Sequence, residues 1–233
     1  MEGQLKKTGF MIVALGLCAP MFVQAETGDW VIRGRAVHVS PNESSDLGRT
    51  VNRNVAPGAM SPGAALAVES NTIPELDISY YLSKHVAAEL ILALGSKHDV
   101  SIRDDQLATV GNQPLGNIDA LPPTLTLQWH FNPDQKIDPY VGAGFNYTRM
   151  LDRDLRLTQG ALAGSRIKVD SDSFGFAVQA GVDIKLSDGW ILNADLKYLD
   201  MDTNVKLRTA GWTRIDRLDI NPWLLGIGIG RRF

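Results

Sequence analysis

Apolar and polar residues alternate one by one along much of this chain, which is the pattern of β-strands whose two faces meet different surroundings. The longest run extends from Phe174 to Leu186, where every second residue is apolar and those between are glycine, alanine or polar. These thirteen residues would form a strand of about 40 Å, because each residue adds about 3.3 Å. Strands of globular proteins have about 5–6 residues, whereas a tilted strand that crosses a membrane needs about 9–11. The length of the run therefore favours a membrane-spanning strand.

The alternation recurs often enough to predict eight strands. They are Trp30 to about Ser40, Leu76–Leu82, Val86–Leu94, Pro123–Phe131, Pro139–Tyr147, Phe174–Leu186, Trp190–Tyr198 and a last one from Trp223 to Phe233. One face carries mainly Trp, Phe, Tyr and Leu, and the other mainly Gly, Ala, Ser and Thr. Since an eight-stranded barrel has little room inside, the bulky face fits lipid outside and the small, polar face fits the interior. The alternative is a soluble barrel of the lipocalin kind, which this size argument disfavours.

The connections between these segments alternate in length. The long ones lie near 41–72, 95–121, 152–172 and 203–213, and the short ones are 83–85, 132–136 and 187–189. Outer-membrane barrels have short periplasmic turns and longer outer loops. The sequence thus predicts an all-β fold: an eight-stranded antiparallel, up-and-down transmembrane β-barrel in the outer membrane of a Gram-negative cell, with both termini in the periplasm.

Tryptophans near the strand ends predict the two faces of the membrane. Trp30, Trp129 and Trp190 lie beside short turns or a terminus, while Trp223 lies at the other end of the last strand. Ten residues separate Trp223 from Phe233. At about 3.3 Å per residue and a tilt near 40° they span roughly 25 Å, which is the expected height of the apolar band.

The C-terminal strand carries a candidate assembly signal. The chain ends on Phe233, after alternating apolar residues that include Ile227 and Ile229. This ending resembles the signal that the barrel-assembly machinery recognises during biogenesis. Arg231 departs from the pattern, because such signals usually carry an apolar or aromatic residue there. Two interpretations remain open: a weaker signal, or an Arg231 side chain that extends to the polar interface.

Residues 1–25 are predicted to be a cleaved secretory signal peptide. Two lysines precede an apolar stretch from Phe10 to Val23, which is too short to span a bilayer as a helix. Cleavage is expected after Ala25, so that one barrel domain, residues 26–233, remains. The alternative is an uncleaved anchor helix, and no apolar stop-transfer segment of about 20 residues supports it.

Composition excludes several classes of function. The mature chain carries no cysteine, so no disulfide stabilises it in the oxidising periplasm. It has 21 Lys and Arg against 25 Asp and Glu, a formal charge of −4, which argues against nucleic acid as a partner. The four histidines lack metal-ligand spacing, and no phosphate-binding glycine loop indicates a cofactor. His38 and Ser40 could be a base and a nucleophile, but no orienting acid is identifiable, so we expect no enzyme.

Five segments carry patterns beyond simple alternation. In order they are LPPTLTLQWHF at 121–131, PYVGAGFNYT at 139–148, QAGVD at 179–183, YLDMD at 198–202 and NPW at 221–223. Together they resemble the OmpW family of small outer-membrane proteins, and the resemblance extends from Gly28 to Phe233. It implies a barrel with a narrow interior that passes small apolar compounds and, in some members, a receptor for colicins or phage. Outer-membrane lipid and the assembly machinery are the other expected partners.

The inward face supplies candidates for the lining of such a channel. By alternation they are Asp77, Glu89, Ile91, His130, Asp195 and Lys197. Ile91 matches an apolar constriction position of the family, whereas Lys197 stands where members can carry an inward tryptophan. A lining with these charges is less apolar than the family pattern implies.

The interior allows two interpretations. The inward residues line a narrow channel, or they pack as an ion-paired core and the outer loops provide the working surface, as in a receptor. Glycines on the inward face could leave a bore or permit tight curvature. They are Gly142, Gly144, Gly175, Gly181, Gly226, Gly228 and Gly230.

Overall fold

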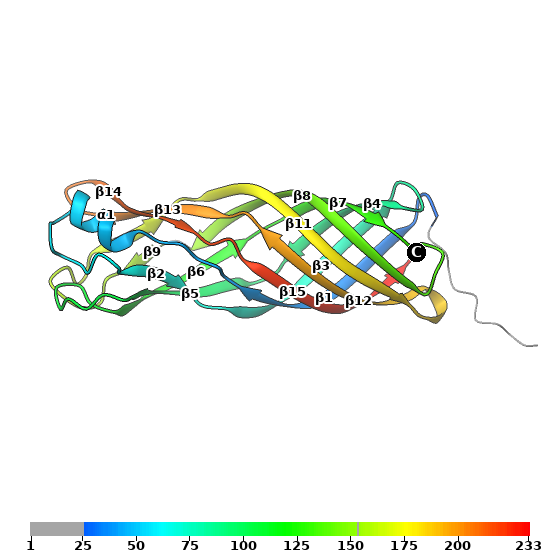
Figure 1. Cartoon of the computed structure of the whole chain (residues 1–233), viewed down its shortest axis with the longest axis horizontal. Helices are drawn as coiled ribbons and strands as arrows, with labels where there is room; N and C mark the ends of the chain where they lie inside the picture. Colours follow the sequence, from blue (N-terminus) through cyan, green and yellow to red (C-terminus); the bar gives the residue numbers. More distant parts are fainter. Residues whose placement is uncertain (1–25, 153) are drawn as a thin grey trace, which may run out of the picture.

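Eight antiparallel strands close into a barrel in the computed structural model, which describes residues 26–152 and 154–233 (Figure 1). The predicted signal peptide lies outside these residues. The barrel strands are β1 (Trp30–Ser40), β3 (Asn71–Tyr81), β4 (Val86–Ala93), β7 (Thr124–His130), β8 (Ile137–Asp152), β11 (Asp172–Lys185), β12 (Trp190–Leu199) and β15 (Trp223–Arg232). Neighbours pair in this order, and the ring closes where β15 pairs with β1. The predicted barrel is therefore confirmed.

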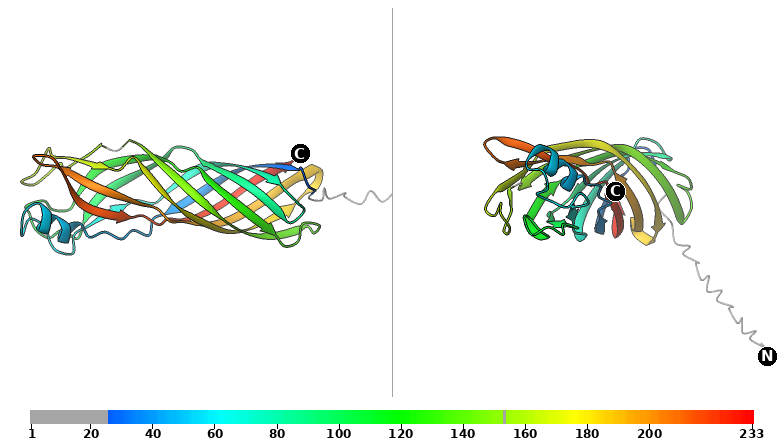
Figure 2. Two further views of the ribbon diagram at one scale, coloured as in Figure 1. Left: turned by 90° about the horizontal axis from the view of Figure 1, so that it is seen from above. Right: turned by 60° about the vertical axis from the view of Figure 1, so that its left-hand side comes forward.

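The long connections, predicted as loops, contain further secondary structure (Figure 2). Three strands extend the wall beyond β8: β2 (Ala65–Val68), β5 (Ser96–Arg103) and β6 (Gln113–Leu121). A separate four-stranded sheet consists of β9 (Asp154–Arg156), β10 (Arg166–Val169), β13 (Asp202–Arg208) and β14 (Trp212–Asp219). Helix α1 (Leu47–Asn54) contacts β14. We call this end of the molecule the extension end.

Among the described residues, no helix has the length and apolar character needed to cross a membrane.

The polarity of the wall reverses along the barrel axis. In the barrel proper, outward Phe174 and Ile227 are 68% and 66% exposed, while inward Glu89 is fully buried. In the extension, inward Leu155 and Leu207 are buried, while the outward side chain of Arg208 is exposed. Apolar side chains face outward where the surroundings are lipid and inward where they are water. The reversal explains why the simple alternation rule did not predict the extension strands.

At the opposite end, the turn end, the connections are short. The turn between β11 and β12 is the 3₁₀ segment η1 (Ser187–Gly189), in which Asp188 and Gly189 have φ of 58° and 77°. The start of β1 and the C-terminus meet there, because the Trp30 amide donates to the Phe233 carbonyl at 3.1 Å. Tryptophans at this end are about half exposed: Trp30, Trp129 and Trp190. Trp223 is 47% exposed at the far end of β15, where it contacts Tyr198 at 5.2 Å between ring centroids.

Candidate functional site

Buried charges occupy the middle of the barrel interior. We call them the ion-pair layer: Arg33, Arg35, Glu75, Asp77, Glu89, Asp183, Asp195 and Lys197. All eight side chains are nearly or fully buried. Alternation along β1, β3, β4, β11 and β12 points each of them inward, as the burial patterns of these strands record.

Arg33 connects opposite sides of the barrel. Its Nη2 lies 2.6 Å from Asp183 Oδ2 on β11, and its Nη1 lies 3.4 Å from Glu89 Oε1 on β4. Nη1 also donates to Ser79 Oγ at 2.7 Å. One guanidinium thereby ties together β1, β3, β4 and β11.

Arg35 and Lys197 share the remaining carboxylates. Arg35 Nη1 lies 3.2 Å from Glu75 Oε1 and 3.0 Å from Asp77 Oδ2, and its Nη2 lies 3.3 Å from Glu89 Oε1. Lys197 Nζ lies 2.7 Å from Glu75 Oε1 and 2.8 Å from Asp195 Oδ1. Buried charges are costly unless they are paired and hydrogen-bonded. The network pairs every one of these charges, but it leaves Arg33 Nε, both Asp77 carboxylate oxygens and Asp195 Oδ1 without a hydrogen bond.

Inward glycines provide the room that the arginine stems occupy. Gly230 and Gly228 on β15 lie opposite Arg33 and Arg35 in register. A Cβ at Gly230 would lie 2.6 Å from Arg33 Cγ, and a Cβ at Gly228 would lie 2.8 Å from Arg35 Cγ. The space left by these glycines is therefore filled with arginine side chains rather than left as a bore.

Polar side chains fill the interior around the layer in the same way. Gln179 packs against Gly142 and donates to Glu89 Oε2 at 2.9 Å. The Tyr140 hydroxyl donates to Asp195 Oδ2 at 2.8 Å. Nearer the turn end, His130 Nδ1 lies 3.0 Å from Asp138 Oδ2. This half of the interior is a packed polar core.

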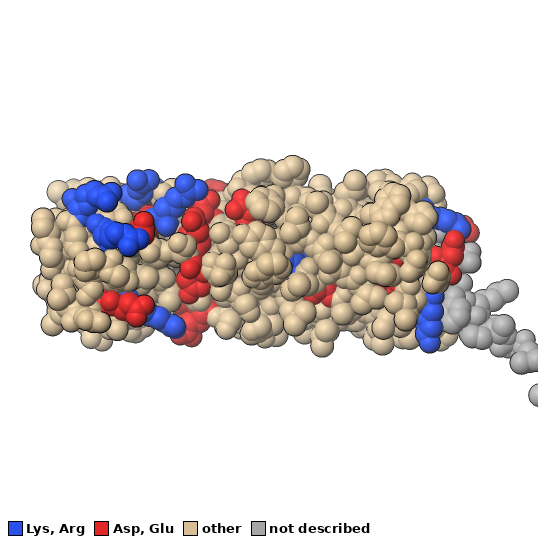
Figure 3. Space-filling model, in the orientation of Figure 1, with Lys and Arg blue, Asp and Glu red and all other residues tan. Residues whose placement is uncertain are grey.

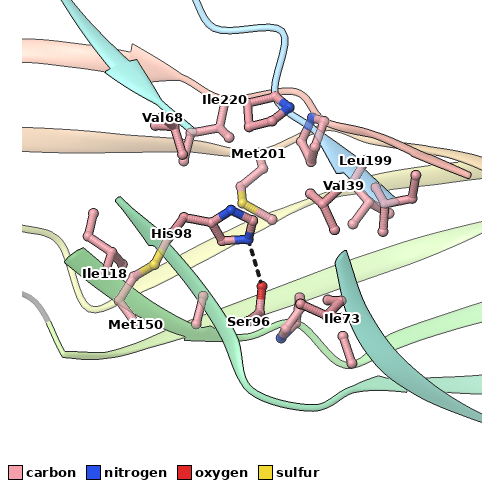
Figure 4. A pocket seen from close by; sticks show the side chains of 16 residues that line it. Val39, Val68, Ile73, Ser96, His98, Ile118, Met150, Leu199, Met201 and Ile220 are labelled. Carbon is pink, nitrogen blue, oxygen red and sulfur yellow. Dashed lines mark hydrogen bonds between the residues drawn. The ribbon is translucent and has the colours of Figure 1, made fainter. Parts of the chain in front are cut away.

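Above the ion-pair layer, toward the extension end, the interior becomes apolar. A cavity of about 60 Å³ opens there, and almost all of its lining is apolar. Its walls include Val39, Ile73, Ala93, Ile118, Met150, Leu199, Met201, Ile220 and Leu224 (Figure 4). These residues come from barrel strands and from the extension, so the cavity lies where the two parts join.

The two polar side chains that line the cavity, His98 and Ser96, form hydrogen bonds with each other or with the backbone. His98 Nδ1 lies 2.9 Å from the Glu69 carbonyl, and Nε2 lies 3.0 Å from Ser96 Oγ, the bond drawn in Figure 4. A carbonyl only accepts, so Nδ1 carries the proton and Nε2 accepts from the hydroxyl. Neither imidazole nitrogen is then free to bind a polar solute.

The structure brings most of the predicted lining residues together. Asp77, Glu89, Asp195 and Lys197 belong to the ion-pair layer, and His130 lies below it. Ile91 is buried opposite Asp77 in register but does not line the apolar cavity. Sequence reasoning missed several polar residues of the same interior: Arg33, Arg35, Glu75, Tyr140, Gln179 and Asp183. Arg33 and Arg35 are two residues apart on β1 and therefore lie on the same, inward face of the strand. That spacing was the signal that could have identified both arginines.

The predicted assembly signal lies on the outer surface of β15. Ile227, Ile229 and Phe233 are 66%, 49% and 65% exposed. The Arg231 guanidinium lies 5.5 Å from the ring centroids of both Trp190 and Phe233, so it extends along the aromatic rim at the turn end. His38, the residue considered as a base, is exposed, and its Nδ1 lies 3.1 Å from Thr72 Oγ1.

Comparison with known proteins gives consistent matches along the whole described chain. Residues 26–233 match the model of the OmpW family. The chain is 33% identical to Outer membrane protein W of Vibrio cholerae over 227 residues, which are 97% of each chain. The crystal structure of OprG from Pseudomonas aeruginosa superposes with a TM-score of 0.76 at 29% identity, covering 90% of this chain and 98% of that one. A more distant relative, at 26% identity over 98% of this chain and all of its own, is the dibenzothiophene metabolism operon protein PahQ of Pseudomonas aeruginosa.

Proposed function

This chain belongs to the OmpW family of outer-membrane proteins, and from that premise we propose that its barrel takes up small apolar molecules through the cavity above the ion-pair layer. The extension faces the outside of the cell, and the turn end, with both termini, faces the periplasm. The observation that carries the proposal is the change of the interior from charged to apolar along one axis.

The cavity has the chemistry of an apolar site. Sites for small ligands are concave and mostly apolar, and here the two polar side chains bind each other or the backbone. The name of the relative PahQ, which refers to dibenzothiophene metabolism, supports an apolar aromatic solute.

The size of the cavity sets a further condition on the solute. Its volume of about 60 Å³ is smaller than the roughly 150 Å³ cavity that holds benzene in another protein. Entry therefore requires side chains to move. Met150 and Met201 line the space, and the unbranched methionine side chain adapts its shape readily.

The solute cannot readily continue along the barrel axis, because the ion-pair layer lies below the cavity. A second groove, of about 360 Å³, shares Pro41 and Val68 with the cavity. Both residues lie beside the junction of β1, β2 and β3. The groove is also lined by Glu43 and Glu69, and we propose that it is the opening through which the solute reaches the cavity from outside.

Uptake of an apolar aromatic probe, such as naphthalene, into proteoliposomes tests this function. Ala93→Phe fills the cavity from a buried wall position, whereas Ala36→Phe adds the same bulk on the exposed outer face of β1. We expect Ala93→Phe to slow entry at least fivefold and Ala36→Phe to leave it unchanged. Equal uptake by both variants and the original protein would overturn the proposal.

The second candidate function is a non-conducting receptor or structural barrel that acts through its outer surface. The strands and helix of the extension favour it, because binding surfaces are often built on rigid scaffolds. Colicins, phage and host surfaces are the partners to test. Binding of such a partner that survives Ala93→Phe, together with absent probe uptake in the original protein, would favour this alternative.

A further inference from the structure

The outer face of the four-stranded sheet carries an unusual concentration of positive charge. We call it the basic flank: Arg156, Arg166, Lys168, Lys206, Arg208 and Arg214. Figure 3 shows basic side chains gathered at the extension end on this side. A narrow band of acidic side chains separates them from the largely uncharged wall of the barrel.

Cross-strand register places like charges directly opposite one another on this flank. Lys168 on β10 pairs with Lys206 on β13, and Lys206 pairs in turn with Arg214 on β14. One step further out, Arg156 on β9 lies opposite Arg166 on β10. Side chains in such positions have Cβ atoms about 4.5–5.5 Å apart, and like charges there destabilise a sheet.

The carboxylates of the protein neutralise only part of the positive charge on this flank. Lys206 Nζ lies 2.5 Å from Asp170 Oδ1. Lys168 lies opposite Asp154 in register, but among the side chains that the structure describes no carboxylate lies within ion-pair distance of Arg208 or Arg214. Lys168 and Arg208 lie over the ring of Trp212, at 5.9 and 5.4 Å from its centroid. Like charges that lie opposite one another across β10, β13 and β14 point to an anion that binds from outside.

The position of the flank identifies the kind of anion. The flank is a side wall, and it continues the lipid-facing wall upward beyond Tyr198 and Trp223. Lys206 and Arg208 lie four and six residues beyond Asp202 on β13, which is roughly 13–20 Å along the strand at about 3.3 Å per residue. A molecule that stands upright in the membrane beside the barrel would meet this surface at the level of its headgroup and first sugars.

We infer that the basic flank binds the phosphorylated headgroup and inner sugars of the glycolipid that forms the outer leaflet. Arginine and lysine bind phosphate oxygens through charge-assisted hydrogen bonds. The Trp212 ring, over which Lys168 and Arg208 lie, helps to hold these two cations on the surface. The inference rests on the proposed orientation of the barrel but not on the solute or its route.

Binding of purified lipopolysaccharide to the mature protein, refolded into nanodiscs of neutral phospholipid, tests this inference. The flank variant is Lys206→Gln/Arg208→Gln/Arg214→Gln. The matched control, Lys84→Gln/Lys97→Gln/Arg103→Gln, removes three exposed charges elsewhere. We expect the flank variant to bind at least about tenfold more weakly and the control to bind within twofold of the original protein. Removal of phosphate from the lipopolysaccharide should weaken binding of the original protein to a similar extent.

Three results would overturn the inference. They are unchanged binding by the flank variant, equal binding of the dephosphorylated lipid, and a preference of the original protein for a soluble polyanion such as heparin. If the triple variant does not show the heat-dependent gel shift of a folded barrel, the inference is tested instead by how lipopolysaccharide binding to the original protein depends on salt concentration. Binding through phosphate weakens as salt is raised, and binding that is insensitive to salt would contradict the inference.

Discussion

Arg33 reaches across the barrel to Asp183, with Nη2 2.6 Å from Oδ2, although β12 and β15 lie between their two strands in the wall. Both side chains are buried. The strand of Arg33 is hydrogen-bonded to β15 and β3 and not to β11, which carries Asp183, so the two residues are not cross-strand neighbours. An ion pair that crosses the interior blocks the barrel axis and divides the interior into two compartments. The apolar cavity on one side is thereby separated from the turn end on the other.

Breaking this contact should destabilise the barrel. In Arg33→Met, the carboxylates of Asp183 and Glu89 lose a cation while they remain buried, and loss of one partner of a buried pair costs about 3–5 kcal/mol. Urea unfolding in lipid vesicles measures the change. The double variant Arg33→Met/Asp183→Leu should lose less stability than the two single variants added together. Strict additivity would show that the contact is not coupled.

The extension should be sensitive to pH through Asp216. Burial, helped by the nearby charge of Asp219, raises the pKa of Asp216 to about 6, against the hydrogen bond from Ser45. Because this pKa is higher in the folded state than in the unfolded chain, stability is fully present below about pH 4. It is lost as the pH rises from about 4 to about 6.

Hydrogen exchange of the Asp46 amide, which donates to Asp216 Oδ1 at 2.9 Å, reports that effect. After correction for intrinsic exchange rates, its protection should fall between about pH 4 and about pH 6. Asp216→Asn, which cannot ionise, should abolish the fall. Protection that falls equally in the variant would contradict this assignment.

Ser96 should control how the cavity treats polar solutes. In Ser96→Ala, His98 Nε2 loses its donor and becomes free to accept from a solute hydroxyl. One hydrogen bond is worth about 0.5–1.5 kcal/mol net. Entry of a medium-chain alcohol relative to the matching alkane should therefore rise about two- to tenfold in proteoliposomes. An unchanged ratio would indicate that solutes do not approach His98.

Strand alternation predicted the barrel and the inward direction of its charges. Asp77, Glu89 and Lys197 were expected inside because bulky apolar residues occupied the other face of their strands, and these residues are buried there. What alternation cannot predict is which charges meet. Arg33 and Asp183 are 150 residues apart, and their contact depends on the stagger of strands around the ring.

The apolar cavity and the extension were beyond the sequence pattern for a related reason. The rule of polar inside and apolar outside applies only where lipid surrounds the wall. Leu199 and Met201 are inward and apolar, and above them the outward side chains of the wall are polar, such as Lys206 and Arg208, so the interior there is an ordinary apolar core.

The most direct test of the account is single-channel conductance of the refolded mature barrel in a planar bilayer, with its folded state verified by the heat-dependent gel shift. The ion-pair layer fills the interior between the cavity and the turn end, so we expect no discrete openings under an applied voltage. Reproducible unitary openings in the original protein would contradict the closed interior and would require an axial path past Arg33 and Asp183.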